Sequence, residues 1–379
     1  MPNLWKSRCI PAVASLAAGL VLAADATAAE YATEKLRLNV ETVAAGLDHP
    51  WGMAFLPKGK ILVTERRGRL LLIDGEDRHE VDGVPPVARG GQGGLLDLEA
   101  DDNFATSRRI YFTYSEPGPG GASTALATAR LSDDGKRLED LNRLWVMAKK
   151  TGTPIHFGSR IVLAPDGKLF VTTGDRGEMD RAQDFSDSAG AVIRLNRDGT
   201  IPADNPFAAS GKGLPELWSK GHRNVQGAAW DPSRNMLWTV EHGAMGGDEI
   251  NAPEPGKNYG WPVITYGVNY NGAKIGVGTA AQGYEQPLFY WDPSIAPSGL
   301  AVASGEMFAP WRGDLLVGAL KYQLLTRLDI EDGKIVAEER MLEGEYGRIR
   351  DVQQGPDGAI YLLTDESDGQ LLRLTPAGD

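Results

Sequence analysis

Six stretches of the sequence repeat one pattern, in which a short apolar segment, a turn and a second segment rich in β-branched and aromatic residues follow one another. Three copies keep a Pro-x-Gly turn, at residues 53–64, 161–172 and 352–363. Proline presets φ at a turn and glycine accepts positive φ. Each of these copies therefore predicts two antiparallel strands joined by a tight hairpin.

Three looser copies complete the set, at residues 95–114, 228–240 and 300–320, and a further apolar segment follows several of the six. A single unit of this kind cannot bury both faces of its sheet, whereas a closed ring of units can. The repeats therefore predict an all-β fold, a six-bladed β-propeller with four-stranded antiparallel blades. The alternative is a β-sandwich or a pair of smaller β domains.

The N-terminus has the features of an export signal. Lys6 and Arg8 precede an apolar stretch at residues 10–23, and small residues follow at 26–28. The apolar stretch is shorter than the roughly 20 residues that a bilayer requires. We therefore expect residues 1–28 to be a signal peptide cleaved near residue 28, which indicates a periplasmic protein without stable insertion in a membrane.

The rest of the chain, residues 29–379, is expected to form a single propeller domain. The single cysteine of the sequence, Cys9, lies in the predicted leader. The mature protein would therefore contain no disulfide and no cysteine–metal site. The formal net charge of −12 argues against nucleic acid or an anionic membrane as the main partner. In such an acidic protein, a local group of basic side chains would indicate a binding site for an anion.

One histidine has a position suited to catalysis. His156 comes just before the repeat that starts at residue 161, where the first strand of a blade would begin near the central channel. Its ordinary pKa, near 6.5, suits a general base at neutral pH. The alternative is a structural histidine held by hydrogen bonds.

Several basic and amide side chains share this kind of position at the ends of predicted strands. They are Gln92, Arg223, Asn224, Lys321, Arg348 and Arg350. If they face one mouth of the ring, they form a basic pocket for a small ligand with several negative charges. The alternative is that they are scattered over the surface.

A glycine-rich loop follows the fourth repeat. Residues 241–251 include Asp248 and Glu249, so the loop offers backbone carbonyls and carboxylates together. Hard oxygen ligands of this kind suit Ca²⁺, although the spacing is not that of an EF-hand.

A series of motifs resembles the soluble PQQ-dependent glucose and aldose sugar dehydrogenases, the glucose/sorbosone dehydrogenase family. The motifs follow the family order over nearly all of the mature chain and occupy residues 46–55, 91–96, 156–160, 174–177, 195–206, 221–227, 247–251, 258–262 and 348–351.

The resemblance implies roles for single residues. His156 matches the catalytic base, which removes the proton of the anomeric hydroxyl while hydride passes to PQQ. The residues that match cofactor contacts are Gln92, Arg223, Asn224, Lys321, Arg348 and Arg350. Arg223, at the quinone end, would also stabilise the charge that develops there.

The resemblance also implies two calcium sites. Gly243 and Ala244 match backbone carbonyls that bind the Ca²⁺ next to PQQ, and Glu249 with the backbone of Tyr259 matches a structural site. Asp248 is included among the predicted metal ligands. Glucose-specific relatives have proline where this chain has Ala244, an exchange that a carbonyl ligand tolerates.

A departure from the glucose-specific pattern bears on the substrate. Those members have aspartate immediately before the catalytic histidine, and this chain has Ile155. The exchange removes a hydrogen-bond acceptor for substrate or histidine, so we expect a wider range of aldoses.

The sequence therefore predicts periplasmic oxidation of aldoses to lactones with PQQ and Ca²⁺. The electrons would pass to an external quinone or cytochrome, and the protein would be a monomer or homodimer. Two alternatives remain: a metal-dependent lactonase-type hydrolase on a six-bladed propeller, and a non-catalytic sugar-binding propeller.

Overall fold

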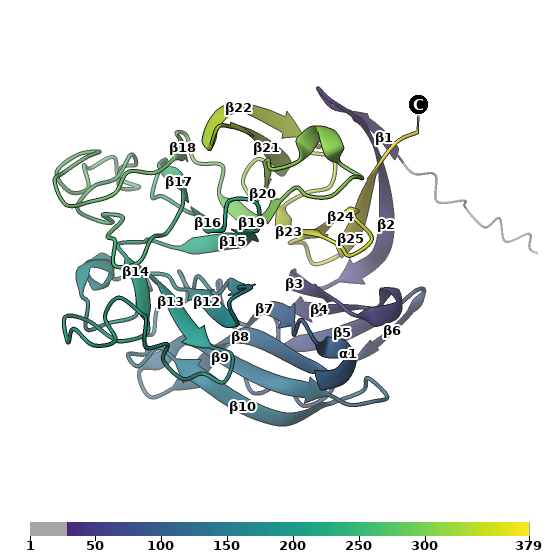
Figure 1. Ribbon diagram of the computed structural model, residues 1–379, viewed down its shortest axis with the longest axis horizontal. Coiled ribbons are helices and arrows are strands. Elements are labelled where there is room, and N and C mark those ends of the chain that lie inside the picture. The colour runs from purple at the N-terminus through teal and green to yellow at the C-terminus, as the bar shows by residue number, and fades with distance from the viewer. Residues whose placement is uncertain (1–28, 379) are drawn as a thin grey trace, which may run out of the picture.

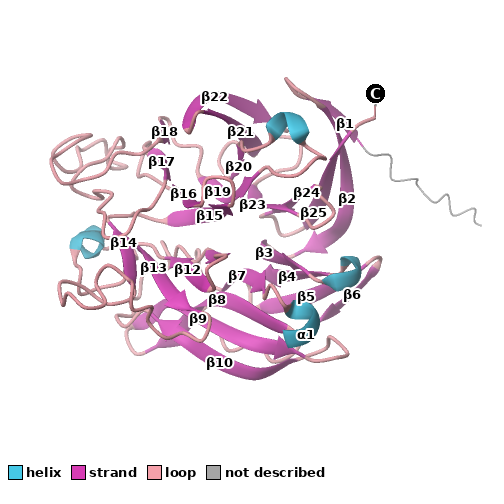
Figure 2. Cartoon of the chain, in the orientation of Figure 1, coloured by secondary structure: helices cyan, strands magenta, loops and turns pink. Residues whose placement is uncertain are grey.

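The computed structural model describes residues 29–378 of the 379-residue chain. The predicted signal peptide, residues 1–28, lies outside the described residues. Six antiparallel sheets are grouped round the middle of the molecule, as Figure 1 shows. Figure 2 shows that strands and loops make up nearly all of the chain.

The first three blades follow one another along the chain. Blade 1 contains β3 (Pro50–Phe55), β4 (Ile61–Glu65), β5 (Arg69–Asp74) and β6 (Asp77–Glu80). Blade 2 contains β7 (Leu95–Ala100), β8 (Arg109–Gly118), β9 (Gly121–Leu131) and β10 (Leu138–Val146). Blade 3 contains β11 (Ile161–Leu163), β12 (Lys168–Thr172), β13 (Ala191–Asn196) and β14 (Leu217–Lys220).

The other three blades complete the ring. Blade 4 contains β15 (Val225–Asp231), β16 (Met236–Glu241), β17 (Asp248–Asn251) and β18 (Phe289–Trp291). Blade 5 contains β19 (Pro297–Val302), β20 (Leu315–Ala319), β21 (Leu324–Glu331) and β22 (Lys334–Met341). Blade 6 contains β23 (Ile349–Gln354), β24 (Ile360–Thr364), β25 (Gly369–Pro376), β2 (Arg37–Leu47) and β1 (Ala29–Ala32).

The helices are short. They are α1 (Phe104–Ser107) and the 3₁₀ turns η1 (Pro57–Gly59), η2 (Met179–Gln183) and η3 (Ala309–Trp311). Within residues 29–378, no helix has the length and apolar character needed to span a membrane.

The first strand of every blade lies at the centre, and each contacts the first strand of the next blade, from β3 through β7, β11, β15, β19 and β23 back to β3. One apolar cluster fills each interface between neighbouring blades. Since both faces of a blade are covered near the centre, its inner strands are buried on both sides, as the five residues of β24 are, whereas an outer strand such as β6 is largely exposed. The six-bladed propeller predicted from the repeats is confirmed.

The ring is closed by strands from both ends of the chain. β2 pairs antiparallel with β25, with Val40 opposite Leu374 and Thr42 opposite Leu372. In Figure 1 the N-terminal β2 lies beside the C-terminal β25. The N-terminal strand therefore completes the last blade, and β1 adds a fifth, outer strand to that sheet.

Candidate active site

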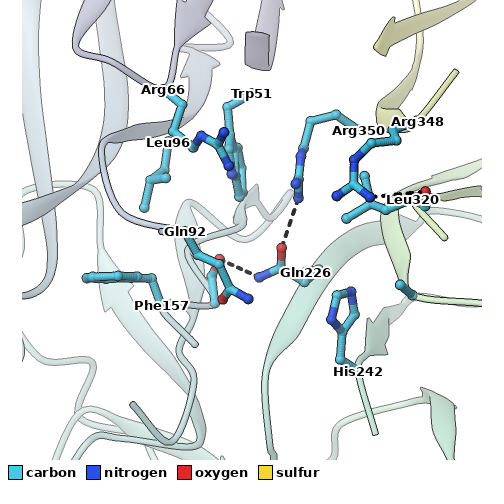
Figure 3. A pocket seen from close by; sticks show the side chains of 12 residues that line it. Trp51, Arg66, Gln92, Leu96, Phe157, Gln226, His242, Leu320, Arg348 and Arg350 are labelled. Carbon is cyan, nitrogen blue, oxygen red and sulfur yellow. Dashed lines mark hydrogen bonds between the residues drawn. The ribbon is translucent and has the colours of Figure 1, made fainter. Parts of the chain in front are cut away.

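A cavity of about 140 Å³ lies at one end of the central channel. Figure 3 shows the side chains that line it, with Arg66, Arg348 and Arg350 on one side and His242 and Phe157 across from them. The cavity combines guanidinium groups with aromatic and amide side chains, so it suits a polar, flat ligand better than an apolar one.

The lining residues come from two positions in the blades. One set lies at or just before the starts of first strands and includes Trp51, Gln92, Phe157, Gln226, Arg348 and Arg350. The other set follows the ends of second strands and includes Arg66, His242 and Leu320. Because the two strands are antiparallel, the start of one and the end of the other meet at the same edge of the blade. Three predicted residues, Gln92, Arg348 and Arg350, are thus brought together.

The arginines of this cavity outnumber the nearby carboxylates. Arg350 forms an ion pair with Asp365 at 2.6 Å, and the same carboxylate lies 3.9 Å from Arg348 and 3.8 Å from Arg66. Burial alone would raise the pKa of Asp365, but Arg350 and Arg66 hold that pKa below its ordinary value. Asp365 is therefore ionised, and one negative charge faces three positive ones.

Several buried donors near the cavity have no acceptor among the described residues, and two of them belong to predicted site residues. They are Nε of Arg350 and Nδ2 of Asn224, whose residues are 5% and 0% exposed. A buried donor without an acceptor is costly. Together with the excess of guanidinium groups, these donors fit a ligand rich in anionic and carbonyl oxygens, and PQQ, with three carboxylates and a quinone, is such a ligand.

His156 lies beside this cavity and is held in place on two sides. Its Nδ1 lies 2.6 Å from Oδ1 of Asp175, and its backbone N–H donates to Oε1 of Gln92 at 2.7 Å. The residue has φ of +54°, an uncommon value for a residue with a side chain. Gly174 makes room for it, since a Cβ at that position would lie 2.3 Å from the carbonyl oxygen of His156.

Asp175 determines which nitrogen of His156 carries the proton. The carboxylate also accepts from Nε1 of Trp261 at 2.8 Å and from the N–H of Gly177 at 2.7 Å. Although burial opposes it, the hydrogen bond with His156 lowers the pKa of Asp175, so the group is ionised and accepts from Nδ1–H. Nε2 of His156 is then the unprotonated nitrogen. Burial also lowers the pKa of His156, and Asp175 opposes this shift while Arg223 adds to it.

Arg223 and Asn224 precede β15 at the same end of the channel. Arg223 donates to the carbonyl of His242 at 3.3 Å, and its guanidinium carbon lies 5.3 Å from the centre of the Trp261 ring. Oδ1 of Asn224 accepts from the N–H of Gly158 at 3.1 Å. Both residues thus contact residues that line the cavity or hold the His156–Asp175 pair.

Lys321 lies on the rim rather than in the cavity. It follows β20 and is exposed, its backbone N–H donates to Ile295, and its Nζ lies 5.1 Å from the centre of the Tyr322 ring. Its neighbour Leu320 lines the cavity. Lys321 is therefore next in sequence to a lining residue, but its own side chain does not line the cavity.

The glycine-rich loop, residues 243–247, is anchored by Asp248. Oδ1 of Asp248 accepts from the N–H of Gly243 at 2.8 Å, and Oδ2 accepts from Ser294 and from two backbone N–H groups at 2.7–3.0 Å. These contacts give Asp248 a role in holding the loop, and its predicted role as a metal ligand stays a prediction. Only glycine fits at 243, since a Cβ there would lie 2.2 Å from the Gly246 carbonyl oxygen. Ala244 packs in an apolar cluster with Trp261.

An oxygen-rich cluster lies behind this loop. Asn251 donates to the carboxylates of Glu241 and Glu249, both at 3.1 Å, and its own Oδ1 is buried without a donor among the described residues. Burial and the neighbouring Glu241 raise the pKa of Glu249 well above its ordinary value. A cation bound beside these oxygens would give Oδ1 of Asn251 a partner and would stabilise the ionised form of Glu249. Tyr259, the other predicted ligand, stacks on His222, whose Nδ1 contacts Glu241 at 2.7 Å.

Among residues 29–378, no group of three or more His, Asp or Glu side chains is placed to hold a metal ion. The donor sets of the two predicted calcium sites are instead mainly backbone carbonyls, with Glu249 as a carboxylate. Such sets are suitable for Ca²⁺, which binds carbonyl and carboxylate oxygens together.

Several site residues were not predicted from the sequence. Arg66, Trp51 and Gln226 line the cavity, and Asp175 contacts His156. A signal existed for each of them. Arg66 follows β4 as Lys321 follows β20. Trp51, Asp175 and Gln226 lie in the motifs at residues 46–55, 174–177 and 221–227, but none of the three had been given a role.

The chain is similar to known proteins over most of its length. The family model described as "Glucose / Sorbosone dehydrogenase" matches residues 47–373. The aldose sugar dehydrogenase YliI of Escherichia coli is 43% identical over 351 residues, which cover 89% of this chain and 93% of that protein.

Two solved structures share the fold over similar lengths. The soluble aldose sugar dehydrogenase of Escherichia coli in its apo-form has 44% identity and a TM-score of 0.87, covering 90% of this chain and 100% of that one. The PQQ-bound form of the aldose sugar dehydrogenase of Streptomyces coelicolor has 29% identity and a TM-score of 0.74, with the same coverage. The resemblance inferred from the motifs is confirmed: the chain belongs to the glucose/sorbosone dehydrogenase family.

Proposed function

We propose that this chain oxidises aldose sugars at the anomeric carbon to lactones, with PQQ as the bound acceptor. The observation that carries the proposal is a histidine oriented by a buried carboxylate beside a cavity with three guanidinium groups and one ionised carboxylate. The relatives named as aldose sugar dehydrogenases, one of them solved with PQQ, support the same activity.

The residues that would hold PQQ fall into two groups. Arg348, Arg350 and Lys321 would meet its carboxylates, since guanidinium groups pair with carboxylates through two hydrogen bonds. Arg223, Asn224 and Gln92, on the side of His156, would meet the quinone oxygens. When bound, PQQ supplies a two-electron acceptor for the hydride that leaves the anomeric carbon.

His156 would take the proton of the anomeric hydroxyl at Nε2. The ionised Asp175 keeps the other proton on Nδ1 and stabilises the imidazolium that forms. Arg223, which lies close to His156 and Asp175, would stabilise the negative charge that develops on the quinone oxygens. The Trp261 contact to Asp175 keeps the carboxylate from turning away.

Replacing Asp175 with asparagine is expected to lower kcat about 10- to 100-fold, the size of effect that follows loss of an orienting partner of a functional histidine at metal sites. Asparagine has one acceptor oxygen for the donors that Asp175 now serves and no charge to hold the Nδ1 proton. Because Asp175 raises the pKa of His156, the acid limb of the kcat/KM profile should also move to lower pH. Rates at several pH values check both results, with Asp184→Asn, at an exposed turn, as the control.

Calcium would be held by the glycine-rich loop and by the cluster behind it. The carbonyls of Gly243 and Ala244 would bind the ion next to PQQ, and Glu249 with the Tyr259 carbonyl would bind the second. Ca²⁺ at the first site would act as a Lewis acid toward the cofactor.

The substrate range would be broad. Ile155 offers no hydrogen bond to a sugar hydroxyl, and His156 already has its carboxylate partner in Asp175. Without a hydrogen-bonding side chain at position 155 to select one sugar, several aldoses would be accepted.

The cellular setting follows from the leader. Residues 1–28 would direct export to the periplasm, and residues 29–379 would act there as one domain, a monomer or homodimer. Reduced cofactor would be reoxidised by an external quinone or cytochrome.

Reconstitution tests this function. The apoprotein should gain dye-linked oxidation of aldoses only when PQQ and Ca²⁺ are both supplied, and EDTA treatment before loading should prevent the gain. Lactone hydrolysis without PQQ would establish the hydrolase instead, and sugar binding without turnover in either assay would establish the binding protein.

A further inference from the structure

Arg66 follows β4 and brings a third guanidinium group to the cavity. Figure 3 shows its side chain on the same side as Trp51, directed toward the space that Arg350 also faces. The side chain is 22% exposed, so it is mostly withdrawn from water. Its position on blade 1 places it beside Arg348 and Arg350 of blade 6, because these two blades adjoin at the ring closure.

The guanidinium of Arg66 has no acceptor within hydrogen-bond distance among the described residues. The nearest carboxylate oxygen, Oδ1 of Asp365, is 3.8 Å away. Asp365 already accepts from Arg350 at 2.6 Å and contacts Nδ1 of His49 at 2.8 Å. The other two arginines differ in this respect, since Arg348 donates to the carbonyl of Leu320 at 3.3 Å.

The charges around Arg66 also favour an anion. Burial lowers its pKa, and although Asp365 opposes the shift, Arg350 and Arg348 lower the pKa further. A half-buried cation with free donors and two cationic neighbours gains most from a ligand that brings its own negative charge.

We propose that Arg66 is a further anchor for the anionic ligand of this cavity and pairs with one of its carboxylates. For PQQ, a planar carboxylate would meet the planar guanidinium in the paired geometry that lysine or glutamine cannot provide. This inference rests on the proposed function for the identity of the ligand. It assigns to Arg66 a role in affinity and none in the proton transfer at His156.

The test compares Arg66→Gln with Arg67→Gln, a matched control one residue away. Arg67 is 65% exposed in its side chain and pairs with Asp48 on the surface. Titration of each apoprotein with PQQ in the presence of Ca²⁺, followed by tryptophan fluorescence, gives Kd. We expect Arg66→Gln to raise Kd about 10- to 100-fold, the loss of one charge-assisted hydrogen-bonded pair, and to reduce the dependence of Kd on salt. Arg67→Gln should bind as the wild type does.

A second readout separates affinity from catalysis. At saturating PQQ, Arg66→Gln should keep kcat within a few-fold of wild type, and Arg66→Lys should recover part of the affinity because it restores the charge alone. The inference would be overturned if Arg66→Gln and Arg67→Gln had equal Kd values for PQQ. If Arg66→Gln does not fold, equal Kd values for Arg66→Lys and wild type would overturn it. Wild-type protein that binds no PQQ would instead overturn the proposed function, and the inference with it.

Discussion

The variant His156→Ala is expected to lose kcat by about 10²- to 10⁴-fold while its Kd for PQQ stays within a few-fold of wild type. In the proposed reaction Nε2 of this side chain would accept the anomeric proton, and among the described residues its one side-chain hydrogen bond is with Asp175. Loss of the side chain therefore removes a base and no cofactor contact. Steady-state rates at saturating PQQ, together with a PQQ titration, check both parts.

The matched control is His79→Ala, since His79 lies on β6 in blade 1, and among the described residues its one side-chain hydrogen bond is with the Gly135 carbonyl. It should retain full activity. Wild-type turnover in His156→Ala would rule out this histidine as the base.

The wild-type pH profile provides a check without a variant. Protonated His156 cannot accept a proton, so kcat/KM falls as the pH drops through its pKa. Burial lowers that pKa below the ordinary 6.5. The acid limb should therefore lie below pH 6.5, and a limb above pH 7 would contradict the assignment.

The second large effect concerns stability and lies deeper in the channel. Nη1 of Arg160 donates to Asp97 and to Asp351, both at 2.7 Å, and Nε donates to the Gln226 carbonyl at 3.2 Å. The guanidinium also lies 4.5 Å from the centre of the Trp51 ring. This one side chain of blade 3 thus contacts blades 1, 2, 4 and 6.

Replacing Arg160 with methionine should destabilise the fold by about 3–5 kcal/mol, the cost of leaving buried carboxylates without their partner. Burial already raises the pKa of Asp97 to about 7, and the neighbouring Asp351 adds to this while Arg160 opposes it. Without Arg160 that pKa rises further. A raised carboxyl pKa means that the folded state binds more protons than the unfolded state, so stability falls as the pH rises. The deficit should be larger at pH 8 than at pH 5.

Denaturant unfolding at the two pH values measures the deficit. The control is Arg37→Met, which removes an exposed pair with Glu30 and should change stability little. If Arg160→Met were as stable as wild type at pH 8, the buried ion pairs would not hold the channel together.

The blades could be predicted from the sequence because each hairpin is encoded locally. The turns at residues 57–59 and 165–167 carry proline and glycine, and the strands on either side are apolar on both faces. The closure by β2 was not predicted, because its partner β25 lies more than three hundred residues away and no local pattern records that pairing. Register between distant strands is fixed by packing, and packing is not visible in a single sequence.

The site was predictable where a residue stands at a strand end in a recognisable motif, as His156 and Arg350 do. Three features could not be predicted: the contact by which Asp175 orients His156, the guanidinium of Arg66 without an acceptor among the described residues, and the contacts by which Asp248 anchors the loop. Each depends on which side chains meet across blades, so charge and spacing along the chain do not specify it. Lys321 shows the same limit, because its place on the rim depends on how the side chain turns after β20.

The most direct test is a crystal structure of the protein prepared with PQQ and Ca²⁺. We expect one PQQ over the cavity, with its carboxylates against Arg348, Arg350 and Arg66 and its quinone toward His156 and Arg223. PQQ bound at the opposite end of the channel or on the outer surface, with these side chains empty, would contradict it.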